Sequence, residues 1–323
     1  LKGEKSAVDK ATKEILRHFA SGDGSKEVRR KRNNEHSRGT KQYWKFYADE
    51  PPTPKYWRHF KDGVGLVDAL RNWIGKARVE RYDVDPKTFN AIKTLVEKTW
   101  VPKAGVGADA KNLNHSKLKV RKVERIENIN LYKKYAEKRK ELFARLSTGG
   151  SVKKLEAIQP SGSAGNCKPI LTANIDDRMN SDVFPEMNEY YLFHGTKSDL
   201  EDNIIHKGFD QRYCGDNAMF GRGVYAAESS TKADQYADDK DNRRKSNLHM
   251  FLVRVLLGEM YVSNVPKRFD LPPCRNCRSE KCADPKHHPY DSVVGDGKWL
   301  FREFVVYSQD QCYPEYVITY DRT

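Results

Sequence analysis

Apolar residues recur with the period of an α-helix in the first half of the chain. The recurrence spans residues 85–100 and 131–146, and a shorter stretch lies at 8–19. Apolar positions three and four residues apart predict amphipathic helices. The two longer helices would bury Phe89, Ile92, Leu95 and Val96 in the first, and Leu131, Tyr135, Leu142 and Leu146 in the second.

The second half of the chain changes to short runs of β-branched and aromatic residues. A strand-like alternation appears first at 118–124, and later runs lie at 190–193, 223–227, 250–257, 301–307 and 316–320. Residues 147–185 are rich in Ser, Gly and Pro without a sustained period, so we expect a long loop or insertion there. Helices first and strands later favour an α+β domain over an alternating parallel sheet.

Positive charge is concentrated near the start of the chain. The sequence holds 59 Lys and Arg against 45 Asp and Glu, a net charge of +14, and residues 1–45 alone carry 13 basic and 6 acidic side chains. The run RRKR at 29–32 could bind nucleic-acid phosphates or act as a nuclear import signal, and the alternative is a solvated tail that does neither. We therefore predict a basic, partly disordered arm, 1–45, before a folded domain, 46–323.

The composition also bears on the cellular setting. The sequence has no run of about 18 apolar residues, and its first residues lack the apolar core of a signal peptide. We expect a soluble intracellular protein with no membrane partner. The arm favours the nucleus, alone or together with the cytoplasm.

Three polar residues interrupt the strand-rich half: His194, Tyr225 and Glu303. Glu303 lies between Phe301 and Val305 at a spacing of two, so its side chain shares their face of a strand. A carboxylate on a buried face must find partners or lose its charge. Each residue alone could be an ordinary hydrogen-bonded core group, and the spacings by themselves do not reveal a reaction.

The strings around these residues resemble a known family. "LFHGT", "MFGRGVYAAESSTKADQYA" and "REFVVYSQDQCYPEYVITY" are similar to the poly(ADP-ribose) polymerase family, in its His-Tyr-Glu form. "VRKVERIENINLYKKYAEKR" and "PKYWRHF" resemble the opening of the family's shorter members, so the likeness covers roughly 50–323. It implies an α+β ADP-ribosyltransferase fold, with two packed, mostly antiparallel sheets and flanking helices behind the basic arm.

The resemblance implies NAD⁺ as substrate and assigns roles to residues of this chain. Gly195 would meet the nicotinamide amide through its main chain, where a side chain would block the approach. His194 would bind the adenosine ribose. Tyr225 would lie beneath the nicotinamide ring, and Tyr236 would stack on its other face. Thr196 completes the "HGT" motif of the NAD-binding set.

Glu303 has the chemical role in this interpretation. Departure of nicotinamide leaves a sugar that resembles an oxocarbenium ion, and a carboxylate on the ribose hydroxyl stabilises that positive charge. It can also orient the incoming acceptor. In the loop 209–222, Arg222 is our candidate for the pyrophosphate, with Arg212 as the alternative.

Three features depart from the family pattern. Ala233 stands where the family usually has a Ser that binds the nicotinamide amide, which removes one hydrogen bond unless Ser230 or Thr231 replaces it. Glu303 matches polymerising members, whereas the branches most similar to this chain commonly have an apolar residue there and transfer single units. The insertion at 147–185 has no counterpart in the pattern.

The predicted function is transfer of ADP-ribose from NAD⁺ to protein acceptors, the protein itself included, with extension to poly(ADP-ribose). One alternative is a strict mono-ADP-ribosyltransferase. Another is an inactive module that binds NAD or nucleic acid, with residues 1–45 as the nucleic-acid-binding part. An intact Glu303 argues against the inactive module, because a pure binder has no need of this carboxylate.

A separate cluster of cysteines and histidines lies at 274–288. Cys274, Cys277 and Cys282 are followed by His287, which is the ligand set of a closed Cys₃His zinc site. His288 is the competing ligand, and three reduced loop thiols are the alternative to a metal site. Because the cluster lies away from the His, Tyr and Glu motifs, we expect a structural zinc ion that serves stability more than chemistry. Three further cysteines are isolated in the sequence: Cys167, Cys214 and Cys312.

Overall fold

The computed structural model describes residues 53–60, 79–102, 107–147, 152–158, 167–176, 178–179, 182–215, 218–297 and 299–323. The predicted arm, 1–45, its helix at 8–19 and the boundary at 45–46 lie outside these residues. Within the described residues, no helix is long and apolar enough to cross a membrane.

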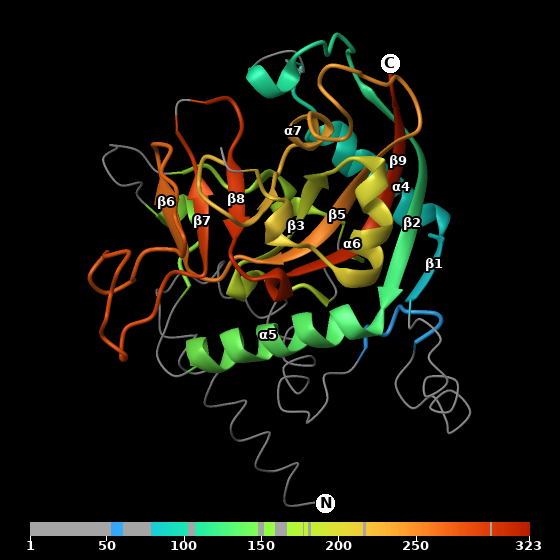
Figure 1. Ribbon diagram of the computed structural model, residues 1–323. Helices are drawn as coiled ribbons and strands as arrows, with labels where there is room; N and C mark the ends of the chain where they lie inside the picture. The colour runs from blue at the N-terminus through green and yellow to red at the C-terminus, as the bar shows by residue number, and fades with distance from the viewer. Residues whose placement is uncertain are drawn as a thin grey trace, which may run out of the picture.

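Two sheets form the centre of the fold (Figure 1). Sheet one has the strand order β1 (Val79–Asp83), β2 (Leu118–Asn128), β9 (Cys312–Arg322), β5 (Leu248–Leu256) and β3 (Glu189–Gly195). Sheet two has the order β4 (Val224–Ala226), β8 (Glu303–Val306), β7 (Ser292–Gly295) and β6 (Met260–Ser263). All neighbours pair antiparallel except β6 and β7, which are parallel. The α+β class with mostly antiparallel sheets is confirmed.

Helices flank the sheets, and the two longest of the described helices lie at the predicted places. α4 (Pro86–Lys98) and α5 (Ile129–Ser147) occupy the two helical patterns, and α6 (Glu201–Lys207) and α7 (Ser230–Asp234) are short additions. Asp85 caps α4, because its carboxylate accepts the backbone N–H groups of Lys87 and Thr88 at 3.0 and 3.1 Å. α5 runs along one end of both sheets, below them in Figure 1.

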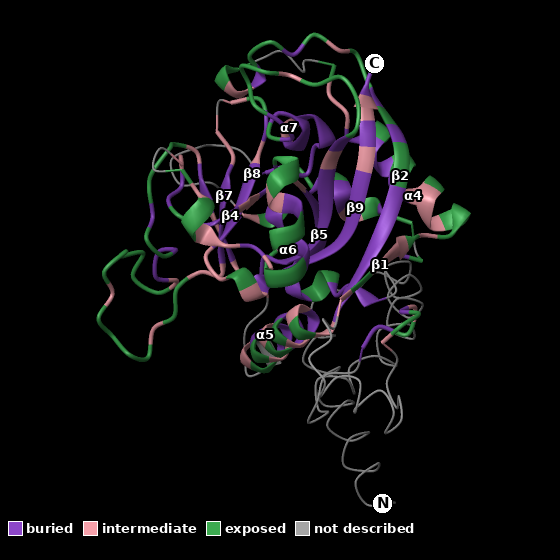
Figure 2. Ribbon diagram, turned by 45° about the vertical axis from the view of Figure 1, so that its right-hand side comes forward, coloured by how far each residue is buried: buried purple, intermediate pink, exposed green. Residues whose placement is uncertain are grey.

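Most strands are buried, α7 is buried as well, and α4, α5 and α6 expose their outer faces (Figure 2). In β2, the sequence pattern predicted only the first part of a strand that runs to Asn128. The predicted insertion at 147–185 contains short 3₁₀ turns in its described parts, η3 (Leu155–Ala157) and η4 (Leu171–Asn174), and η6 (Pro185–Met187) follows it. The segment packs on the domain, since η4 and η6 both contact β3.

The described segment 53–60 docks on the domain through one buried ring and one carboxylate. Trp57 is 1% exposed and packs against Tyr132 and Tyr313, with ring centroids 5.0 and 6.1 Å away. The Glu127 carboxylate accepts the backbone N–H groups of His59 at 2.8 Å and Phe60 at 3.1 Å. The motif "PKYWRHF" is therefore part of the folded domain.

Buried charges lie where β3, β5 and β9 run side by side. Arg254 is fully buried and its guanidinium binds Glu189 at 2.7 Å and Asp182 at 3.2 Å. Arg125 pairs with Glu315 at 2.7 Å. Each of these buried charges has an opposite partner, which is the condition for burying it without a large loss of stability.

Candidate active site

The two sheets meet where β3 ends. Phe193 and Ala227 exchange backbone hydrogen bonds of 2.7 and 2.8 Å, which fixes the end of β3 against the residue that follows β4. His194 comes directly after Phe193, and Tyr225 lies two residues before Ala227. The main chain thus brings the predicted His and Tyr motifs together.

His194 is held by a hydrogen bond to the backbone of the Tyr motif. Its Nδ1–H donates to the carbonyl oxygen of Tyr225 at 2.6 Å, and its ring lies edge-on to Phe209 at 4.9 Å. A carbonyl oxygen only accepts, so the proton of the neutral ring is on Nδ1 and Nε2 is an acceptor. Burial lowers the pKa of His194, against the opposing effect of the hydrogen bond. The neutral ring can therefore accept a hydrogen bond from a sugar hydroxyl.

Gly195 lies directly against the backbone of α7. A Cβ atom at this position would lie 1.8 Å from the carbonyl oxygen of Ala233. Because that neighbour is main chain and cannot swing aside, only glycine fits. The sequence predicted a glycine for the approach of a ligand, and the structure adds an independent reason for it, the packing of α7 on β3.

The hydroxyl of Tyr225 is tied to the turn that precedes it. It donates to the carbonyl oxygen of Gly221 and accepts the backbone N–H of Phe220, both at 2.9 Å. Gly221 has φ +86°, a conformation that favours glycine. Tyr307 adds a hydrogen bond of 2.5 Å to the Phe220 carbonyl oxygen. The position of the Tyr225 ring is therefore coupled to the turn at 218–221.

Glu303 is paired with a lysine that the sequence reasoning missed. Glu303 is a buried residue, 8% exposed, and its Oε1 lies 3.0 Å from Lys232 Nζ. Lys232 also binds Asp109 at 2.9 Å. Burial alone would lower the pKa of Lys232, but Tyr236, Glu303 and Asp109 raise it above its ordinary value. The ammonium therefore stays charged and keeps the Glu303 carboxylate oriented.

The two predicted tyrosines both lie near this carboxylate. Burial is the main cause that raises the pKa of Tyr225 and of Tyr236, and the charge of Glu303 adds to both shifts. Tyr236 is 44% exposed and donates to Asp109 Oδ2 at 2.7 Å. The partly exposed ring of Tyr236 leaves a face for stacking, which stays a prediction.

The remaining predicted residues fall around this centre. Thr196 is buried at the end of β3, while Arg222 and Arg212 are both exposed in the loop 209–222, where Arg212 pairs with Asp210 at 2.6 Å. The hydroxyls near Ala233 are already engaged on the side of α4. Ser230 Oγ donates to the Val96 carbonyl oxygen at 2.8 Å. Thr231 Oγ1 accepts the backbone N–H of residue 101 at 2.7 Å.

Lys232 and Asp109 are the functional candidates that sequence reasoning overlooked. Lys232 lies inside the quoted string "STKADQY", four residues before Tyr236, so a helical reading of that string could have found it. Asp109 belongs to a separate 3₁₀ turn, η2 (Ala108–Ala110), and no local pattern connects it to the site.

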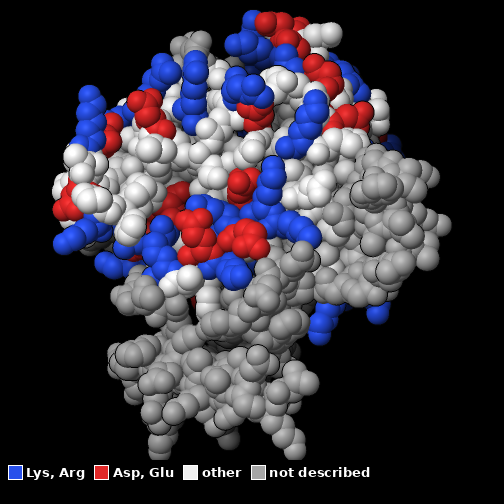
Figure 3. Space-filling view, turned by 60° about the horizontal axis from the view of Figure 1, so that its bottom comes forward, with Lys and Arg blue, Asp and Glu red and all other residues white. Residues whose placement is uncertain are grey.

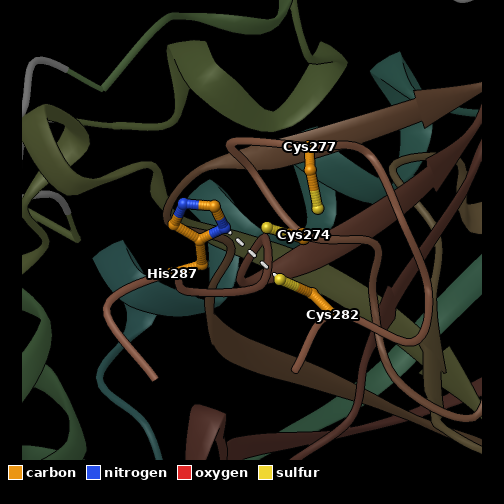
Figure 4. Close-up of side chains that lie close together, drawn as sticks. All are labelled: Cys274, Cys277, Cys282 and His287. Atoms are coloured by element: carbon orange, nitrogen blue, oxygen red, sulfur yellow. Dashed lines mark hydrogen bonds between the residues drawn. The ribbon is translucent and has the colours of Figure 1, made fainter. Parts of the chain in front are cut away.

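The predicted metal ligands are gathered in the loop between β6 and β7 (Figure 4). The ligand atoms of Cys274, Cys277, Cys282 and His287 all lie within 4.8 Å of one another. A zinc ion with Zn–S bonds of about 2.3 Å needs sulfurs about 3.8 Å apart, so a small contraction closes the site. Cys282 Sγ lies 3.3 Å from His287 Nδ1, and His287 Nε2 lies 3.5 Å from Asp284. This is the usual arrangement of a metal-bound histidine with a carboxylate behind it.

The competing ligand is not part of the cluster. His288 is exposed, and its carbonyl oxygen accepts the backbone N–H of Arg275 at 2.9 Å. Among the described residues, this Cys₃His group is the only metal-binding cluster of three or more such side chains.

A cavity of about 170 Å³ lies elsewhere and shares no residue with the His, Tyr and Glu cluster. Segment 53–60, β1, α4, β2, β3 and β9 contribute to its walls, which include Tyr56, Arg125 and Tyr316. Arg125 already lies over the Tyr56 ring at 4.2 Å and pairs with Glu315. The chemistry of the His, Tyr and Glu motifs is therefore not located in this cavity.

Comparison with known proteins agrees with this geometry. A family model of the poly(ADP-ribose) polymerase catalytic domain matches residues 104–322, which include every residue of the cluster described above. The chain belongs to this family. The match begins after β1 and α4 and ends at the last residue of β9.

Curated relatives in the poly(ADP-ribose) polymerase family are similar over part of the chain. Protein mono-ADP-ribosyltransferase PARP11 of Mus musculus is 32% identical over 153 residues, 42% of this chain and 43% of that protein. Protein mono-ADP-ribosyltransferase PARP12 of Mus musculus is 34% identical over 139 residues, 42% of this chain and 17% of that protein. Protein mono-ADP-ribosyltransferase PARP14 of Homo sapiens is 27% identical over 246 residues, 74% of this chain and 10% of that protein. The chain therefore spans less than half the length of these relatives.

Proposed function

We propose that the protein is an NAD⁺-dependent ADP-ribosyltransferase that modifies protein side chains. The observation that carries the proposal is that the His, Tyr and Glu motifs lie close together in the fold. His194 binds the backbone of Tyr225, and the charge of Glu303 acts on Tyr225 and Tyr236. The family match and the mono-ADP-ribosyltransferase names of the relatives support the same reaction.

Each group has a part in the chemistry. The bond between ribose C1′ and the nicotinamide nitrogen breaks, and its electron pair leaves with nicotinamide, whose ring becomes neutral. The sugar carbon gains positive charge, which the nearby Glu303 carboxylate stabilises more in the transition state than in the ground state. A nucleophile of the acceptor protein then bonds to C1′ and loses its proton.

Lys232 limits what Glu303 does in the resting protein. Because Lys232 Nζ lies 3.0 Å from Glu303 Oε1, this oxygen is already paired with a cation before the donor binds. The other carboxylate oxygen is the one that we assign to the ribose hydroxyl. Lys232 also pairs with Asp109, so its positive charge is shared between two carboxylates.

Two product types remain distinct candidates. The relatives are named mono-ADP-ribosyltransferases, which favours transfer of a single unit. Glu303 favours extension, because a carboxylate beside the donor site can polarise the hydroxyl of a bound ADP-ribose unit. Extension to poly(ADP-ribose) is thus the second candidate and rests on Glu303 alone.

Automodification with labelled NAD⁺ tests the proposal. The purified chain should become labelled, with a single band for single transfer or a ladder for extension. Chain denatured before mixing with NAD⁺ controls for non-enzymatic attachment of ADP-ribose. Absence of label in the native chain, both on itself and on added protein acceptors, would remove the transferase assignment.

We also propose a structural zinc ion at Cys274, Cys277, Cys282 and His287. The compact ligand set and the Asp284 carboxylate behind His287 support it. Protein prepared without chelators should contain about one zinc per chain, and a Cys274→Ser, Cys277→Ser double variant should contain none. A Cys167→Ser variant, which changes a thiol outside the cluster, should keep its zinc. Metal-free native protein would contradict the assignment.

The basic arm motivates a nuclear location and nucleic-acid binding. The RRKR run supports this proposal, together with the excess of 13 basic over 6 acidic side chains at 1–45. The face of the domain in Figure 3 carries both signs interspersed, so it offers no comparable basic field. Deleting residues 1–40 should move the protein to the cytoplasm and weaken its salt-dependent binding to nucleic acid. Unchanged location and binding would leave the arm a solvated tail.

A further inference from the structure

The cysteine loop is distant from the donor site in sequence but joined to it in space. The loop leaves β6 after Ser263 and returns at Ser292 in β7. Phe269 lies at its start, five residues before Cys274, and is 1% exposed. Its aromatic ring packs in one hydrophobic cluster with Phe220, Val293 and Val305, against which Tyr225 also packs.

Main-chain atoms make the contact between Phe269 and the turn at 218–221, which holds the Tyr225 hydroxyl. Phe269 N–H donates to the Phe220 carbonyl oxygen at 3.4 Å. A Cβ atom on Gly221 would lie 1.9 Å from the carbonyl oxygen of Phe269, so only glycine lets the two backbones approach this closely. The same two residues, Phe220 and Gly221, bind the hydroxyl of Tyr225.

The far end of β7 and the segment after it contact the same turn. A Cβ atom on Gly295, at the end of β7, would lie 2.2 Å from the ring of Phe220. Trp299 lies against that ring as well, with centroids 5.8 Å apart. Phe220 therefore lies between the entry segment of the cysteine loop and the residues at and after the end of β7.

The ligand cluster closes this loop near Phe269. Backbone hydrogen bonds of 2.9 Å join Pro273 to Tyr290 and Arg275 to His288, so the two ends of the cluster run together. Tyr290 packs on Tyr261 at 5.5 Å, and Tyr261 packs on Phe269 at 5.8 Å.

One ion pair also crosses from the entry of the loop into the cluster. Lys267 pairs with Glu280, which lies between Cys277 and Cys282. A metal ion bound by the four ligands would therefore fix the segment that carries Phe269.

We propose that Phe269 is a positioning residue for the donor site and that zinc occupancy sets donor affinity through it. The inference rests on the proposed donor site and on the proposed zinc centre. Zinc orders the loop, Phe269 then holds the turn at 220–221, and the turn holds the Tyr225 ring beneath the nicotinamide. Sequence distance suggested a zinc ion that serves stability more than chemistry, whereas these contacts connect the ion to donor binding.

Thermodynamic linkage relates the affinity for zinc to the affinity for the donor. If zinc strengthens donor binding by some factor, donor binding must strengthen zinc binding by the same factor. Couplings of this kind usually lie between about 5- and 150-fold, and we expect roughly tenfold here. Zinc would thus act on the affinity for the nicotinamide end of NAD⁺.

The experiment uses the full chain and benzamide, which carries the amide and aromatic ring of nicotinamide. Calorimetric titration should show about tenfold weaker benzamide binding after zinc is removed under reducing conditions. Zinc affinity, measured by competition with a chelator, should rise by the same factor in saturating benzamide. Equal benzamide affinity with and without zinc would overturn the linkage.

Substitutions separate Phe269 from general loosening of the loop. Phe269→Ala should keep one zinc per chain and weaken benzamide binding, and removal of zinc should then weaken it less than in the parent. Leu271→Ala is the matched control, because Leu271 lies two residues away in the same loop and is 59% exposed. It should bind benzamide as the parent does. A Leu271→Ala variant as weak as Phe269→Ala would overturn the role of Phe269.

Two further outcomes are decided in the same series. If circular dichroism shows that zinc removal unfolds the chain, Phe269→Ala with zinc bound becomes the deciding measurement, and parent affinity in that variant overturns the proposal. Zinc-loaded parent that binds no benzamide overturns the donor site itself and the linkage with it. The failure of the donor site is thus distinguishable from failure of the linkage alone.

Discussion

Ala233 gives the site its clearest departure from the family pattern at the scale of single residues. Its carbonyl oxygen packs against Gly195, and the nearby hydroxyls of Ser230 and Thr231 bond to the backbone of residues 96 and 101. Neither hydroxyl is therefore turned to the place that the missing Ser would fill. In the proposed donor site, the nicotinamide amide would therefore have one protein partner fewer than in the family pattern.

Restoring the hydroxyl should strengthen donor binding. Ala233→Ser adds one oxygen, and a new hydrogen bond contributes about 0.5–1.5 kcal/mol, which is roughly a two- to twelvefold lower dissociation constant. Titration with benzamide measures it. The Michaelis constant for NAD⁺ should fall while turnover stays close to the parent value, because the bond forms in both ground and transition states. Equal benzamide affinity in both proteins would show that the register of this segment is wrong.

His194 predicts a pH dependence with a definite sign. Its pKa in the folded protein lies below the ordinary value of about 6.5, chiefly through burial. A neutral histidine contributes stability that is complete above the ordinary pKa and is lost as the pH falls through it toward the folded value. The imidazole signal of His194 in NMR should therefore titrate below pH 6.5, and binding of ADP-ribose should weaken only there. A midpoint at or above 6.5 would contradict the neutral Nδ1–H form.

Elements differ in how much of them the sequence could reveal. Long periodic segments, such as α4 and α5, were predicted within a few residues of their ends. The missed elements have little pattern to read: β6 and β7 have four residues each, and the edge strand β1 reads VERYD. Their pairing comes from long-range contacts, which no local period encodes.

The candidate site shows the same limit. His194, Gly195, Tyr225 and Glu303 lie within strings that carry the resemblance. Asp109 is far from these strings in sequence, and it joins the site through hydrogen bonds from Lys232 and Tyr236. Phe269 likewise contacts the turn at 218–221, and it lies in a loop whose sequence drew attention only through its cysteines.

The segment 53–60 is an element whose contribution to stability can be measured. Trp57→Ala removes a ring that is 1% exposed, and the loss of a large buried ring usually costs about 3–5 kcal/mol in the free energy of unfolding. Urea denaturation of the two proteins gives the difference. Tyr213→Ala is the comparison, since this aromatic ring is 66% exposed and its loss should change stability by less than about 0.5 kcal/mol. Equal stabilities for the two variants would contradict docking of this segment.

In the molecule as a whole, each of the two sheets supplies part of the candidate site. The five-stranded sheet supplies His194 and Gly195 at the end of β3, and the four-stranded sheet supplies Tyr225 and Glu303. The site thus exists only when both sheets are joined at Phe193 and Ala227. The cysteine loop connects β6 to β7 within the second sheet, so it can affect the Tyr and Glu half of the site without contact with His194.

Release of nicotinamide from NAD⁺ reports directly on cleavage of the bond between ribose and nicotinamide. Chromatography should show nicotinamide formed by the parent and by Glu141→Gln, a substitution of an exposed glutamate on α5 that pairs with Lys138. Glu303→Gln keeps the size of the side chain and removes its charge, so release should fall by about 10²–10³-fold without vanishing, and any polymer should be lost. A parent that releases no nicotinamide, or a Glu303→Gln protein that releases it at the parent rate, would contradict the account.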